Sequence, residues 1–98
     1  MAIKVVVEMK AKPGERDRLK HLLDALIAEI GPGLKDKGWL GSTLHEALDD
    51  PEVLVEIADW QTAAGHQAVM GDLETAEALA PVVQLLASPL RDRVLDVH

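Results

Sequence analysis

The sequence predicts one α+β domain in which helices cover a single face of a four-stranded antiparallel sheet. Two kinds of pattern predict this class. Several segments are rich in β-branched residues or alternate in polarity, as strands do, and one long segment repeats apolar residues at helical spacing. The segments follow one another in the order β-α-β-β-α-α-β, and a length of 98 residues corresponds to one domain, residues 1–98.

The first strand and the first helix carry the clearest patterns. Residues 3–9 are mostly β-branched and predict a strand, which a Pro-Gly turn ends. The next segment begins with Glu15 and Asp17, where the helix dipole favours acids. It then shows one apolar stripe at helical period, formed by Leu19, Leu22, Leu23, Leu26, Ile27 and Ile30. We expect Gly31-Pro32-Gly33 to end or bend this helix.

The rest of the chain predicts two strands, two helices and a last strand, over residues 39–48, 53–60, 62–70, 74–86 and 90–97. The acidic turn at residues 49–52 favours a hairpin between the first two of these strands. Thr62 is a suitable N-cap for the short helix that follows the hairpin. This order of elements suits the ferredoxin-like split β-α-β arrangement.

The strands are apolar on both faces, which predicts a partner. Val5-Val6-Val7 and Val53-Leu54-Val55 place apolar side chains on alternate sides of the sheet, while the helices can cover only one side. An exposed apolar face usually marks a partner surface, and the simplest partner is a second copy. We therefore expect a homodimer that packs sheet to sheet. The alternative is a monomer that tolerates a few surface valines.

Composition excludes several classes of function. The formal net charge is −7, without a basic stripe, so we expect no nucleic acid and no membrane surface as partner. The chain has no cysteine, which excludes disulfides and thiol catalysis and favours a cytoplasmic protein. The histidine and acidic residues show no tight metal-ligand spacing, so we predict no metal site.

Four motifs, in order along nearly the whole chain, resemble the antibiotic biosynthesis monooxygenase (ABM) family: Lys12-Pro13-Gly14-Glu15, Gly38-Trp39-Leu40-Gly41, Ile57-Ala58-Asp59-Trp60 and Thr62-Ala63-Ala64-Gly65-His66. The resemblance implies an α+β barrel formed by two chains, in which the last strand commonly reaches the other subunit. It also implies a cavity between the helices and the sheet of each subunit. One branch of this family oxidises anthrone-like polyketides or quinols without metal or flavin, and another degrades haem.

The residues separate these two branches. The haem-degrading branch carries a helical histidine ten residues after the strand-end tryptophan and an asparagine in the first strand, where this chain has Met70 and Val7. Both differences argue against haem degradation. The anthrone-oxidising branch carries the same tryptophan, here Trp60, with an asparagine four residues before it and a tyrosine six after it. This chain has Glu56 and His66 at those two positions.

The candidate catalytic residues are therefore Glu56, Trp60 and His66. Glu56 and Trp60 share one strand face, so a carboxylate and an imidazole in one apolar cavity would act as general base and proton shuttle. The alternatives are a Glu56 that faces solvent or pairs with Arg91 or Arg93 on the last strand, and a purely structural His66. The candidate substrate-binding residues are Trp60, Met70, His45, Leu79 and Val83, of which His45 faces either the cavity or the partner.

The resemblance and these residues predict a cofactor-independent monooxygenase that acts on a small aromatic, quinol or polyketide-like substrate with dioxygen. Two alternatives stay open at this point. The first is a non-catalytic homodimer that binds or helps to bind a small apolar or aromatic ligand in the same cavity. The second is a structural dimer in which side chains fill the cavity. An open cavity that contains both Glu56 and His66 would favour the enzyme.

Overall fold

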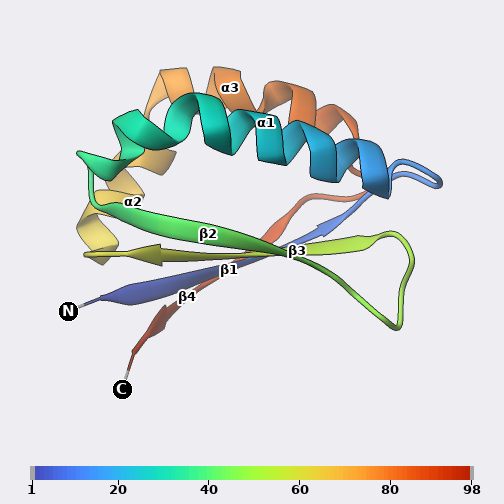
Figure 1. Cartoon of the computed structure of the whole chain (residues 1–98), viewed down its shortest axis with the longest axis horizontal. Coiled ribbons are helices and arrows are strands. Elements are labelled where there is room, and N and C mark those ends of the chain that lie inside the picture. Colours follow the sequence, from blue (N-terminus) through green and yellow to red (C-terminus); the bar gives the residue numbers. More distant parts are fainter. Residues whose placement is uncertain (1, 98) are drawn as a thin grey trace.

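The helices and strands occur in the predicted order in a computed structural model of the chain, which describes residues 2–97 (Figure 1). The elements are β1 (Ile3–Lys10), α1 (Arg16–Lys35), β2 (Trp39–Glu46), β3 (Val53–Trp60), α2 (Ala63–Met70), α3 (Leu73–Gln84) and β4 (Arg91–Asp96). The sheet order is β2-β3-β1-β4, and every neighbouring pair is antiparallel. None of the helices described in residues 2–97 has both the length and the apolar character needed to cross a membrane.

Helix α1 continues through the segment where we expected an end or a bend. It runs to Lys35 with Pro32 inside it. Proline cannot donate to the carbonyl of Ala28, one turn earlier, but both residues lie on the exposed side of the helix, where water can bond that carbonyl. Strand β2 is also shorter than predicted, because the chain leaves the ladder after Glu46 to enter the hairpin loop.

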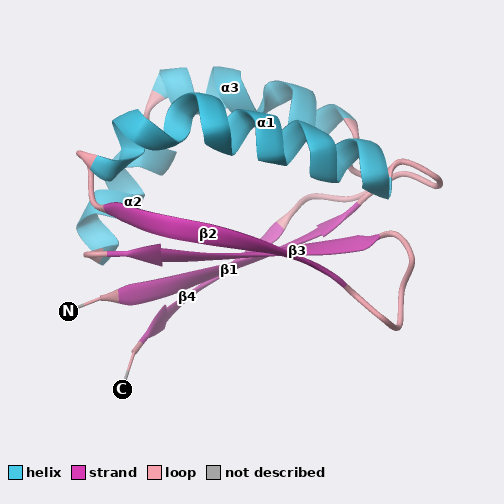
Figure 2. Cartoon of the chain, in the orientation of Figure 1, coloured by secondary structure: helices cyan, strands magenta, loops and turns pink. Residues whose placement is uncertain are grey.

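One face of the sheet and the helices above it form the core (Figure 2). Alternate residues of β1 point to the helices, so Ile3, Val5 and Met9 are buried. The same holds for alternate residues of β3, where Leu54 is fully buried and Trp60 nearly so. The register pairs Ile3 with Trp60 and Val7 with Glu56. Glu56 is the one charged residue that β3 contributes to this inner layer, and it therefore lies beside a valine.

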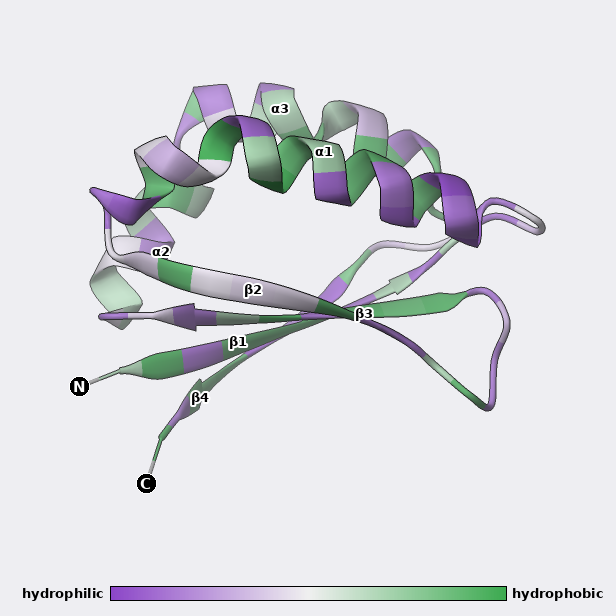
Figure 3. Cartoon of the chain, in the orientation of Figure 1, coloured by the Kyte–Doolittle hydropathy of each residue, from purple (hydrophilic) through white to green (hydrophobic). Residues whose placement is uncertain are grey.

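Within residues 2–97 no helix lies over the opposite face of the sheet (Figure 2). Apolar segments of β1 and β3 are visible in the hydropathy colouring, and Val6, Val55 and Ile57 place apolar side chains on this outer face (Figure 3). Val6 pairs with Ile57 there, and Lys4 forms an ion pair of 2.7 Å with Asp59 at one end. At the edge strand β4 the apolar residues Val94 and Leu95 are 48% and 42% exposed although they point to opposite faces.

A close contact between α1 and β2 fixes the helix over the sheet. Gly31 is buried against the indole of Trp39, and a Cβ atom at residue 31 would lie 2.9 Å from Cζ3 of that ring. Gly33, two residues further on the same helix, has nothing within 4 Å of its corresponding position. The absence of a side chain at residue 31 therefore lets the tryptophan ring lie flat under the helix.

We expect Gly31→Ala to destabilise the fold by about 1–3 kcal/mol, because the methyl group would displace the Trp39 ring from a well-packed layer. Gly33→Ala is the matched control and should be neutral or stabilising by up to about 1 kcal/mol, since alanine is the better helix former. Urea unfolding followed by tryptophan fluorescence measures both. Equal effects of the two substitutions would contradict the proposed contact.

Candidate functional site

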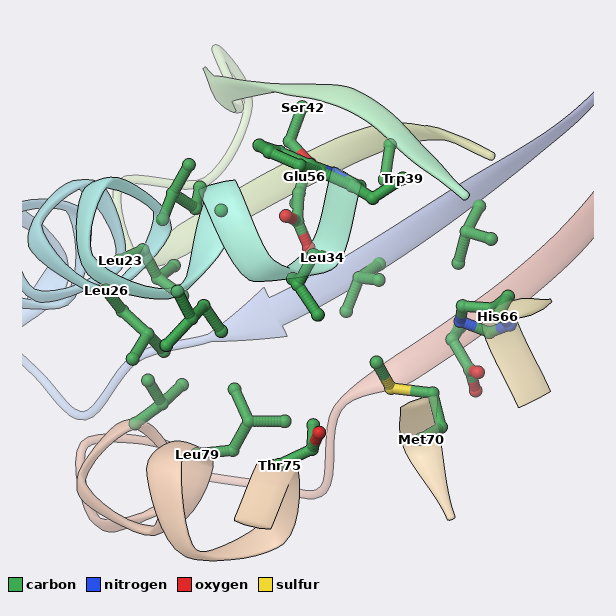
Figure 4. A pocket seen from close by; sticks show the side chains of 18 of the residues that line it. Leu23, Leu26, Leu34, Trp39, Ser42, Glu56, His66, Met70, Thr75 and Leu79 are labelled. Carbon is green, nitrogen blue, oxygen red and sulfur yellow. The ribbon is translucent and has the colours of Figure 1, made fainter. Parts of the chain in front are cut away.

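A cavity of about 140 Å³ lies between the inner face of the sheet and helices α1 and α3 (Figure 4). Most of its lining is aliphatic and includes Val5, Val7, Leu26, Ile27, Leu34 and Leu79. The volume is close to that of an engineered apolar cavity of about 150 Å³ that binds benzene. The closed part of the cavity therefore has room for roughly one aromatic ring.

Glu56 is the charged group in the middle of this lining. It projects from β3 between Val7 of β1 and Leu44 of β2. Among the described residues no lysine or arginine forms an ion pair with it, and Arg91 and Arg93 lie on the opposite face of β4 from the cavity residue Asp92. Burial raises the pKa of the Glu56 carboxyl, and a hydrogen bond from Ser42 partly opposes the increase.

His66 lies near the start of α2, at the other side of the cavity from Leu23 and Leu26 (Figure 4). Its ring is 6% exposed and meets Trp60 edge to face, with centroids 5.3 Å apart and planes at 70°. Nδ1 is buried and has no hydrogen-bond partner among residues 2–97. Burial lowers the pKa of this imidazole, and the Asp92 carboxylate raises it to a smaller extent, so the neutral ring is favoured.

The backbone before His66 is tightly fixed. Thr62 caps α2 as predicted, accepting a hydrogen bond of 3.0 Å from the Gly65 amide. A Cβ atom at Gly65 would lie 2.8 Å from the carbonyl oxygen of Lys37. The Gly65-His66 pair can therefore approach the loop before β2 only because residue 65 lacks a side chain, and this contact sets the direction of the imidazole.

Asp92 is a cavity residue that sequence reasoning missed. It pairs with Val7, which in turn pairs with Glu56, so the three residues form one rung across the inner face. Two strand spacings separate the two acidic residues by roughly 10 Å. The alternation of β4 is the signal that should have revealed Asp92, because its even positions share a face with the odd positions of β1.

Five of the seven predicted site residues line the cavity: Glu56, Trp60, His66, Met70 and Leu79. The other two do not: Val83 was expected in the cavity and lies outside it, and of the two directions left open for His45 the structure shows the one away from the cavity. His45 lies on the outer face of the sheet beside Thr43, with 2.8 Å between its Nε2 and the threonine hydroxyl. Val83 is 56% exposed, since its neighbour Val82 takes the buried side of α3.

The position of His45 follows from an irregularity in β2. A register shift between Trp39 and Gly41 places Trp39 and Ser42 on the same face, although they are three residues apart. Simple alternation beyond Ser42 then turns Leu44 inward and His45 outward. Within residues 2–97 the histidine and acidic side chains form no group of three or more that could hold a metal ion.

This combination of split β-α-β fold and cavity agrees with comparisons to known proteins. The sequence model of the antibiotic biosynthesis monooxygenase family matches residues 2–81, and the chain therefore belongs to this family. Curated protein sequences include no match to the chain.

Solved structures show the same fold at low sequence identity. Protein Rv0793 of Mycobacterium tuberculosis is 24% identical, with a TM-score of 0.78 over 100% of this chain and 96% of that one. A Caulobacter crescentus protein is 18% identical, with a TM-score of 0.84 over 99% and 90% of the two chains. SnoaB of Streptomyces nogalater, a cofactor-independent oxygenase solved as a variant, is 12% identical, with a TM-score of 0.79 over 98% and 92%.

The buried carboxyl of Glu56 gives a prediction for the pH dependence of stability. Burial raises its pKa in the folded protein above the ordinary value of 4.5, so ionisation above that pH penalises folding. We expect Glu56→Gln to leave the free energy of unfolding near pH 4 almost unchanged and to increase it at pH 8. Urea unfolding at the two pH values measures the difference.

Glu8→Gln, on the outer face of β1, is the matched control for the loss of one carboxylate, and it should not reproduce this pH-dependent gain. A gain from Glu56→Gln of the same size at pH 4 as at pH 8 would contradict the assignment, because the uncharged carboxyl carries a much smaller desolvation penalty than the carboxylate.

Proposed function

We propose that this protein is a cofactor-independent monooxygenase for a small aromatic, quinol or polyketide-like substrate. The observation that supports this function best is that one open, mostly aliphatic cavity contains both Glu56 and His66. Met70 and Leu79 line this cavity and leave room for an aromatic ring. The oxygenase activity of SnoaB, which shares the fold, supports the same reaction class.

The proposed reaction begins with proton removal. Glu56, whose pKa is raised by burial, is a stronger base than an ordinary carboxylate and accepts a proton from a phenol or from a C–H group activated by neighbouring rings. The resulting substrate anion transfers electrons to dioxygen, forming a C–O bond. A CH₂ group then becomes a ketone: one oxygen atom stays on carbon, the other leaves in water, and both hydrogens of the CH₂ group end in that water.

His66 has the chemistry of a proton carrier in this scheme. A neutral imidazole has one nitrogen that donates and one that accepts, and Nδ1 of His66 bonds to none of the residues that the structure describes. It can therefore protonate the oxygen intermediate and recover a proton afterwards, with the Asp92 carboxylate stabilising the transient imidazolium. Trp60 forms the part of the cavity wall that the His66 ring contacts edge to face.

We propose in addition that the protein acts as a homodimer through the outer face of the sheet and through β4. Val6, Val55 and Ile57 form the apolar centre of this outer face, and no helix covers them. Strand β4 pairs with β1 of its own chain but has a free edge and exposed apolar residues on both faces. A second copy would cover both surfaces at once.

Oxygen uptake with a panel of anthrones and quinols tests the enzymatic proposal. We expect turnover by the wild type, and a decrease in kcat of at least about 100-fold in Glu56→Gln and in His66→Ala, since each removes a proton-transfer group. His45→Ala is the matched control on the outer face and should retain full turnover. Ligand binding without oxygen uptake by the wild type would instead favour the non-catalytic small-molecule-binding homodimer.

Sedimentation tests the dimer. Wild type should sediment as two chains at micromolar concentration, and Ile57→Asp should raise the dimer dissociation constant by about two to three orders of magnitude, because it buries an unpaired charge. Leu73→Asp places the same charge on a helix residue that is 71% exposed and should leave the dimer intact. A wild-type monomer would refute the proposal.

A further inference from the structure

The indole of Trp39 and the hydroxyl of Ser42 form a hydrogen bond inside the cavity wall. Nε1 of Trp39 donates to Oγ of Ser42 over 2.9 Å. The contact depends on the register shift in β2, where Gly41 has a φ of +146°, a conformation that glycine adopts most readily. Gly31 holds the same indole from the helix side. Backbone and helix packing thus fix both ends of the bond.

This bond determines where the Ser42 proton points. An indole N–H can only donate, and a serine hydroxyl has one hydrogen to donate and lone pairs to accept. Because Trp39 already occupies a lone pair of Ser42, the hydroxyl hydrogen is free for another acceptor. Ser42 pairs with Ala58 and Leu44 pairs with Glu56, so the Glu56 side chain is the diagonal neighbour of Ser42 on the cavity face and its carboxylate is the acceptor within reach. Figure 4 shows Trp39, Ser42 and Glu56 gathered at one side of the cavity.

We propose that Trp39 and Ser42 are positioning residues for Glu56: the indole N–H orients the Ser42 hydroxyl onto one carboxylate oxygen, and the other oxygen faces the cavity to receive a proton from the ligand. Trp39 therefore acts through Ser42 and has no contact role with the reacting atoms. Inference about the ligand rests on the proposed function, whereas the orientation of Glu56 does not.

The arrangement narrows the ligand class. A carboxylate oxygen that faces an aliphatic cavity has lone pairs free to accept a hydrogen bond and no hydrogen to donate. It favours a neutral aromatic molecule with a phenolic O–H or an acidified C–H over one with only acceptor groups. Asp92 and His66 are the other titratable groups that line the cavity, while α1 and α3 contribute none to it. Neither Asp92 nor His66 takes the place of Ser42 as the hydrogen-bond donor to Glu56.

Carbon NMR of protein labelled at the glutamate carboxyl carbons follows the ionisation of Glu56 directly, with the signal assigned by its loss in Glu56→Gln. We expect Ser42→Ala to shift the titration midpoint of Glu56 upward, because the carboxylate loses its donor. Trp39→Phe should shift it in the same direction by less. The double substitution should shift it no further than Ser42→Ala alone, since Trp39 acts only through Ser42.

Ser42→Thr keeps the hydroxyl and should restore the wild-type midpoint. Thr43→Val removes the neighbouring hydroxyl on the opposite face and should leave the midpoint unchanged. An unchanged midpoint in Ser42→Ala, or additive shifts in the double variant, would overturn the proposal. Ser42→Ala alone decides the matter if Trp39→Phe does not fold. The readout needs no turnover, so its result is independent of the oxygen-uptake experiment.

Phenol and its methyl ether, anisole, test the ligand class, because they share one aromatic ring and only phenol has an O–H group to donate. Titration calorimetry at a pH where Glu56 is ionised should show tighter binding of phenol to the wild type. Ser42→Ala should reduce the ratio of the affinity for phenol to the affinity for anisole. Equal affinity of the wild type for the two probes would overturn the donor-ligand inference, even if the NMR midpoints behave as expected.

Discussion

The alternation of side chains across β1 and β3 is the constraint on which the rest of the molecule depends. With a fixed antiparallel register, each residue of these two strands has one possible face. One set of residues meets the helices and forms the core, and the other set forms an apolar outer face. A shift by one residue would exchange the two sets. It would move Glu56 out of the cavity and Ile57 into it, so the cavity and the proposed dimer surface depend on the same register.

The placement of Glu56 shows how a small fold accommodates an unfavourable group. A carboxylate inside an aliphatic layer costs free energy unless it is bonded or neutralised. Here one hydrogen-bond donor offsets part of that cost, and the shifted pKa reflects the remainder. Much of the local structure of β2 serves this donor, including the register shift and Gly41. A buried charged group that lowers the free energy of unfolding is typical of functional sites rather than of cores.

The sequence was sufficient to predict element order, fold class, the Thr62 cap and five of the cavity residues, because periodicity and the family motifs report on them directly. It left open whether α1 ends or bends at Gly31-Pro32-Gly33, since exposure of the residues around the Ala28 carbonyl decides that outcome. It also left the direction of His45 open, because a β-bulge reverses alternation without a unique sequence signal. Asp92 and the Trp39–Ser42 bond required knowledge of the strand pairing, which connects residues far apart in the chain.

The glycine and proline residues at the end of α1 have a consequence for access. Gly31 and Gly33 each lower intrinsic helix stability by about 1 kcal/mol relative to alanine, and Pro32 removes one backbone hydrogen bond. This segment roofs part of the cavity, whereas the floor is the hydrogen-bonded sheet. By intrinsic helix stability alone, opening this last turn would cost less free energy than separating the strands below it. A ligand larger than the cavity would therefore need this turn to move, and the Gly31–Trp39 contact is the packing that it would have to break.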